Sequence, residues 1–163
     1  MSVQAPTPRP PNRVQVEWAG GQRFDAGRPG EARLRIDGTG ETGQGPVDAM
    51  LTALASCVSI DVVEILAKRR TPVGRLTVDV TGERVTTTPR RLRHVRLAFH
   101  VDGDGIERVH AERAIDLAIT KYCSVRDSLA PDIGLEWALT LNGERPGDEA
   151  TGAGRATERA GRA

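Results

Sequence analysis

The sequence predicts a mixed α+β fold with the element order βββ-α-ββ-α-β. Three observations predict it. Apolar and polar residues alternate in several short stretches, which is the period of a half-buried strand. After Pro46, residues 47–70 contain neither Gly nor Pro and are rich in helix formers. Residues 107–121 carry apolar side chains at helical spacing, which predicts a second helix.

The first three strands are expected at residues 13–18, from residue 23 onward, and at residues 32–37. Val14, Val16 and Trp18 alternate with polar neighbours. Gly20-Gly21 then predicts a hairpin turn, and Arg23 begins the return strand. Residues 38–45 contain four glycines and are expected to form a loop.

The long helix is expected to begin at Pro46, because the first turn of a helix does not need the N–H that proline lacks. It is expected to end in the basic run 68–70, before Thr71-Pro72. Its apolar residues cover nearly all of its faces: Met50, Leu51, Leu54, Val58, Ile60, Val62, Val63, Ile65 and Leu66. Such a helix is usually central and buried.

After the long helix, apolar and polar residues again alternate in short stretches. Strands at residues 76–80 and 94–101 are expected to pair antiparallel across a turn at 86–91, and a last strand is expected at 135–141. Residues 122–130 form a short connection or one extra helical turn. Five residues of the second helix are expected to face inward: Val109, Ala114, Ile115, Ala118 and Ile119.

Composition limits the class of protein. The 163 residues include 23 basic and 22 acidic ones, a net charge of +1, which argues against a nucleic-acid or anionic-membrane partner. Residues 1–12 and 143–163 are expected to be disordered tails around one domain at 13–142. We expect no secretory signal and no apolar stretch able to span a membrane, and therefore a cytoplasmic protein.

Two cysteines, Cys57 and Cys123, are too few for a disulfide scaffold or a four-cysteine zinc site. Taken singly, each could be a small buried hydrophobe. His94, His100 and His110 lack metal-ligand spacing and are expected to have surface roles. The glycine-rich loop lacks the Lys-Ser/Thr ending of a phosphate-binding loop. No cofactor and no metal are expected.

Two segments resemble the OsmC/Ohr family of osmotically inducible and organic-hydroperoxide-resistance proteins. Residues 45–57 resemble the helix that carries the family's reactive cysteine, and Lys121-Tyr122-Cys123-Ser124-Val125 is similar to its second-cysteine motif. Residues 58–66 look most like a less characterised branch. The resemblance implies an OsmC-like fold in which two chains form an intertwined homodimer around central, cysteine-bearing helices.

The resemblance also implies a thiol-dependent peroxidase for organic hydroperoxides. Cys57 would be the peroxidatic cysteine, which becomes a sulfenic acid, and Cys123 the resolving cysteine, which condenses with it to a disulfide. A dithiol reductant, a lipoyl group in the family, would restore both thiols.

An arginine from the N-terminal strands stabilises the reactive thiolate in the family, and Arg23 matches that position best. The competing arginines are Arg13, Arg28, Arg33 and Arg35. The peroxidases have Glu directly after the Pro, where this chain has Val47, and Asp48 follows one residue later. Asp48 either orients Arg23 or is simply a first-turn acid favoured by the helix dipole.

An alternative function belongs to a different class. The chain could be a non-catalytic or redox-responsive dimeric binding protein on the same fold, with Leu54, Val58 and their neighbours lining an apolar pocket for a small ligand. Rapid loss of both thiols on mixing with a hydroperoxide would distinguish the enzyme from the binding protein.

Overall fold

The structure is a computed structural model, and residues 9–144 are described here. Residues 1–8 and 145–163, which make up most of the two expected tails, lie outside the described residues. Residues 9–14 form no regular element. The described residues fall into two compact units that divide between Ala49 and Met50, and each unit is described by itself. A single domain at residues 13–142 therefore stays a prediction.

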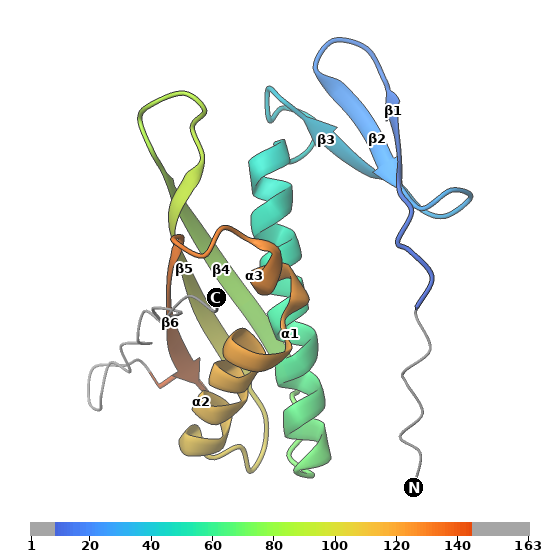
Figure 1. Cartoon of the computed structure of the whole chain (residues 1–163). Coiled ribbons are helices and arrows are strands. Elements are labelled where there is room, and N and C mark those ends of the chain that lie inside the picture. The colour runs from blue at the N-terminus through green and yellow to red at the C-terminus, as the bar shows by residue number, and fades with distance from the viewer. Residues whose placement is uncertain (1–8, 145–163) are drawn as a thin grey trace, which may run out of the picture. The chain divides into compact units, whose positions relative to one another are not determined.

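The order of strands and long helices is the predicted one (Figure 1). The first three strands precede a long helix, two strands follow it, and a second helix leads to the last strand. The structure adds a π-helical turn, η1, and a short helix, α3, before that strand. The elements are β1 (Gln15–Trp18), β2 (Arg23–Gly27), β3 (Leu34–Asp37), α1 (Pro46–Lys68), β4 (Arg75–Arg84), β5 (Leu92–Asp102), α2 (Arg108–Leu117), η1 (Ala118–Tyr122), α3 (Ser124–Ser128) and β6 (Gly134–Leu141).

In the first unit, β1, β2 and β3 form an antiparallel sheet. Gly20 and Gly21 have φ angles of 91° and 60°, so the predicted hairpin turn is confirmed. The expectation that the first strand is half-buried is wrong within this unit, because all four β1 residues are exposed. No helix or second sheet of the described part of this unit covers them.

In the second unit, β5 is the central strand of a three-stranded sheet. It pairs antiparallel with β4, as predicted, and parallel with β6. Its side chains alternate, and Val95, Leu97 and Phe99 are fully buried. Helices α1 and α2 lie over the same face of this sheet (Figure 1). Gly82 on β4 makes room for α1, because a Cβ there would lie 2.9 Å from Leu51 Cδ1.

Helix α1 has the predicted limits but not the predicted burial. Leu54, Val58, Val62 and Leu66 form one fully buried stripe at four-residue spacing, whereas Ile60 is 60% exposed. A single chain thus covers one side of this helix. By length and composition alone α1 could cross a membrane, which corrects the expectation that no such stretch exists. Core helices of soluble proteins also meet this criterion.

Candidate functional site

Cys57 and Cys123 both belong to the second unit and face each other from different elements. Cys57 lies in the middle of α1 and is half-buried, whereas Cys123 follows η1 and is 3% exposed. Both are free thiols. The Cys57 thiol is near enough to Cys123 to add to the rise in the pKa of the Cys123 thiol, and the two sulfurs are not bonded to each other. The fold therefore brings together two cysteines that are 66 positions apart in the chain.

The backbone around Cys123 fixes its sulfur at the start of α3. Its N–H donates to the Ala118 carbonyl at 2.9 Å, which closes the wide π-helical turn. Its Sγ accepts the Arg126 N–H at 3.3 Å and so caps α3. Within residues 122–130, where we expected a short connection or one extra helical turn, the chain forms the short helix α3, and a thiol accepts one of the free N–H groups of its first turn.

The surroundings of Cys123 favour its protonated form. Burial, above all, raises the pKa of the Cys123 thiol to about 11. The Arg126 N–H opposes this rise in pKa, while the neighbouring Cys57 thiol adds to it. At neutral pH Cys123 is therefore a thiol and not a thiolate. Of the pair, Cys57 is the more exposed.

Asp48 closes the N-terminus of α1. Its Oδ2 accepts the Gly45 N–H at 3.0 Å, the reciprocal half of a capping box. On a helix of 3.6 residues per turn, the nine residues from Asp48 to Cys57 correspond to about 2.5 turns. The two side chains therefore leave opposite sides of the helix. This geometry supports the interpretation of Asp48 as a first-turn acid.

Ion pairs set two of the five candidate arginines of the first unit apart from the other three. Arg33 pairs with Glu17, and Arg35 forms a two-pronged pair with Asp25 at 2.6 and 3.1 Å. Arg23 donates only to the Gly20 carbonyl, at 3.3 Å, and no carboxylate pairs with it among residues 9–144. Arg23 thus keeps a guanidinium available for another anion. Its approach to Cys57 stays a prediction.

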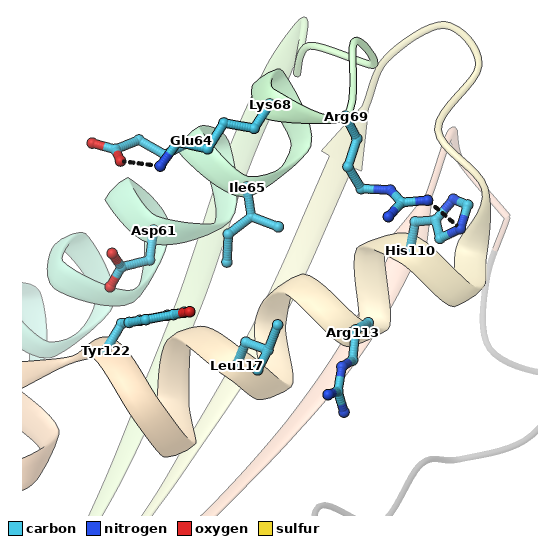
Figure 2. Close-up of a pocket in the computed structure, with 9 residues that line it drawn as sticks. All are labelled: Asp61, Glu64, Ile65, Lys68, Arg69, His110, Arg113, Leu117 and Tyr122. Atoms are coloured by element: carbon cyan, nitrogen blue, oxygen red, sulfur yellow. Dashed lines mark hydrogen bonds and ion pairs between the residues drawn. The ribbon is translucent and has the colours of Figure 1, made fainter.

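Two hollows lie in the second unit, and Cys123 lines one of them. One of about 500 Å³ lies between α1 and the α2–η1 segment, with Tyr122 at one end (Figure 2). The other, of about 520 Å³, includes Cys123 in its lining and is built from residues 119–131. Leu54 and Val58 are fully buried and line neither of these two hollows, and the apolar pocket of the binding-protein alternative stays a prediction.

The histidines contact neighbouring side chains and do not converge. His100 pairs with Asp79 at 3.1 Å across β4 and β5, and His110 accepts from Arg69 at 2.6 Å. Within residues 9–144, no group of three or more His, Cys, Asp or Glu side chains is placed to hold a metal ion.

The fold and the paired thiols define a class of protein, and the comparisons agree. The family model described as "OsmC-like protein" matches residues 38–138, so the chain belongs to the OsmC-like family. The protein YhfA of Escherichia coli K12 is 35% identical over 114 residues, which cover 69% of this chain and 85% of YhfA.

Solved structures share the fold at lower identity. An OsmC-like protein from Mycoplasma pneumoniae superposes with a TM-score of 0.69 at 18% identity, covering 79% of this chain and 95% of that one. The organic hydroperoxide resistance protein OhrB of Bacillus subtilis superposes with a TM-score of 0.55 at 13% identity, covering 78% and 96%. At these identities the likeness shows the fold alone.

Proposed function

We propose that the protein reduces organic hydroperoxides, with Cys57 as the peroxidatic and Cys123 as the resolving cysteine. The observation that carries the proposal is the neighbouring pair of free thiols, one half-buried and one buried and protonated. Family membership supports it, since some proteins of this fold are named for organic hydroperoxide resistance. We further propose that the protein is soluble and lies in the cytoplasm, a compartment in which thiols stay reduced at rest.

Oxidation of the two cysteines proceeds in two balanced steps, and a third step reduces them again. The Cys57 thiolate attacks the terminal peroxide oxygen, the O–O bond breaks, and the leaving alkoxide takes a proton to become an alcohol. Cys57 is then a sulfenic acid. The Cys123 thiol displaces its hydroxyl as water and forms a disulfide, which protects Cys57 from further oxidation. A dithiol reductant, such as a lipoyl group, returns both cysteines to thiols.

The surroundings explain the division of roles. A nucleophile must reach its substrate as a thiolate, which suits the half-buried Cys57 and not a buried thiol whose pKa is about 11. Cys57 lies more than two turns from the start of α1, too far for much stabilisation by the helix dipole. We propose that Arg23 supplies the positive charge, since it matches the position of the family's arginine best and, unlike Arg33 and Arg35, pairs with no acid among residues 9–144.

We also propose that the working form is an intertwined homodimer. Ile60, Val63 and Met50 are exposed on α1, on the sides away from its buried stripe. A second copy of this helix would cover such a face, as the family resemblance implies. In that arrangement Arg23 of one protomer approaches Cys57 of its partner.

The test is the consumption of cumene hydroperoxide by the reduced protein and two variants. Cys57→Ser should abolish consumption. Cys123→Ser should complete one turnover and then accumulate sulfenic acid, which a dimedone adduct of about 138 Da would reveal by mass. Equal consumption by wild type and Cys57→Ser would contradict the proposal, as would repeated turnover by Cys123→Ser without the reductant.

A further inference from the structure

The hollow between α1 and the α2–η1 segment is bounded by the helix that carries Cys57 and by the segment that precedes Cys123. Its lining is Asp61, Glu64, Ile65, Lys68, Arg69, His110, Arg113, Leu117 and Tyr122. Figure 2 shows Asp61 and Ile65 extending from α1 toward the opposite wall, with the Tyr122 ring lying beneath them. Tyr122 directly precedes Cys123 in the chain. We call this space the α1–α2 groove.

Asp61 stands one helical turn after Cys57 on the side of α1 that forms the groove. At 100° per residue, Asp61 lies about 40° around the helix from Cys57, and Lys68 about 20°. Side chains four residues apart on a helix have Cβ atoms about 5–6 Å apart. A hydroperoxide group is of a size to bridge two side chains at this spacing.

Of the two carboxyl groups that line the groove, only Asp61 makes no hydrogen bond or ion pair with residues 9–144. Glu64 pairs with Lys68 at 3.3 Å, whereas no hydrogen bond or ion pair holds Asp61 (Figure 2). Burial, and secondarily the Glu64 charge, raises the pKa of Asp61, and Lys68 lowers it. A half-buried carboxyl without a partner is suited to exchange protons with a molecule that enters the groove.

We propose that Asp61 carries the proton of the Cys57 thiol to the leaving oxygen of the hydroperoxide. This inference rests on the proposed function. The ionised Asp61 takes the proton from the Cys57 thiol, and the resulting thiolate attacks the terminal peroxide oxygen. As the O–O bond breaks, protonated Asp61 gives that proton to the departing alkoxide, which leaves as alcohol. The carboxylate is regenerated and Cys57 is a sulfenic acid, so protons and electrons balance.

The test compares two oxidants that differ in their leaving group. The reduced wild type and Asp61→Asn are mixed separately with tert-butyl hydroperoxide and with peracetic acid, and the rate of Cys57 oxidation is measured. Loss of a general acid–base group costs about 100-fold or more in rate. We expect a loss of that size with tert-butyl hydroperoxide. With peracetic acid we expect a loss at least about tenfold smaller, because acetate leaves without a proton.

Two further variants separate this role from a structural one. Glu112→Gln removes a carboxyl of α2 that pairs with Arg108 and lines neither hollow, and it should leave both rates near wild type. Asp61→Glu keeps a carboxyl and should retain part of the rate with tert-butyl hydroperoxide. Equal losses with both oxidants in Asp61→Asn, or no loss with either, would overturn the inference. Failure of the proposed function looks different, since wild type itself would then react with tert-butyl hydroperoxide no faster than the urea-unfolded chain.

Discussion

At the scale of single residues, the same side chain behaves differently in different surroundings. Cys57 and Cys123 are both thiols, yet only Cys123 is buried deeply enough to have its pKa raised to about 11. The carboxyl groups of Asp48, Asp37 and Asp61 likewise differ. Asp48 caps a helix, Asp37 organises a loop, and Asp61 has no hydrogen-bond or ion-pair partner within residues 9–144. Contacts, and not residue type, assign these roles.

Asp37 makes stability depend on pH in acid. Its carboxylate accepts four hydrogen bonds, from the N–H and hydroxyl of both Thr39 and Thr42, at 2.6–3.0 Å. These bonds, led by the Thr42 hydroxyl, hold the pKa of Asp37 well below its usual range. The unfolded chain therefore takes up a proton at higher pH than the folded one. The stabilisation is present above the unfolded pKa of about 4 and is lost as pH falls toward the lower folded pKa.

The measurement is urea unfolding of wild type and Asp37→Asn at several pH values between about 6 and 2. We expect wild type to be the more stable at pH 6 and the difference to shrink below about pH 4. A difference that stayed constant over this range would show that the Asp37 charge does not contribute.

The resemblance of the segments around Cys57 and Cys123 to family motifs predicted that both belong to one site. The structure places the Cys57 thiol near enough to influence the pKa of Cys123, and their shared catalytic role stays a prediction. The spacing of Asp48 from Cys57 already indicated that they leave opposite sides of the helix. The role that we propose for Asp61 was not predicted from the sequence, because it depends on Tyr122 and Leu117 lining the opposite wall of the groove, which no local sequence pattern indicates.

At the scale of elements, the order of strands and long helices and the limits of α1 were predictable from the sequence. Which side chains of a helix are buried was less predictable. Val109 was expected to face inward but is 61% exposed, because the inward face of α2 is carried by Ala111, Ala114 and Ile115. Residues 107–121 were expected to form one helix. The structure changes to a π-helical turn at Ala118, closed by the N–H of Cys123, which helical periodicity alone does not indicate.

The C-terminus of α1 offers a direct test of its capping. Arg70 has a φ of 63°, while the N–H groups of Arg70 and Thr71 reach back to the Ala67 and Leu66 carbonyls at 2.9 and 3.2 Å. This is a Schellman motif, whose left-handed position favours glycine. Arg70→Gly should therefore increase the free energy of unfolding by about 1 kcal/mol.

The matched control is Ala67→Gly, one residue inside the helix end, which should lower the free energy of unfolding by about 1 kcal/mol. Urea denaturation at neutral pH would measure both changes in the free energy of unfolding. If Arg70→Gly were destabilising like Ala67→Gly, the left-handed conformation of Arg70 would be contradicted.

At the scale of the whole molecule, the proposed dimer predicts which exposed apolar residue matters. Ile60 on α1 and Val109 on α2 are almost equally exposed, at 60% and 61%. Only Ile60 lies on the helix that we propose to be covered by a second copy. Ile60→Asp should therefore yield monomers, because it would bury a charge in the interface. Val109→Asp should remain dimeric.

Sedimentation velocity distinguishes these outcomes, since a dimer has twice the 17.5 kDa mass of one chain. A wild-type monomer at all protein concentrations would contradict the dimer. Dissociation by both substitutions alike would show that exposure, and not position on α1, determines the effect.

The central claim is that Cys57 and Cys123 form one redox pair. The most direct measurement is to mix the fully reduced protein with one equivalent of cumene hydroperoxide, titrate the remaining thiols over time, and map the product by peptide mass. The account predicts rapid loss of two thiols per chain, a disulfide that joins the Cys57 and Cys123 peptides, and a rate well above that of the urea-unfolded chain. Thiol loss as slow as in the unfolded chain, or a product without that disulfide, would contradict it.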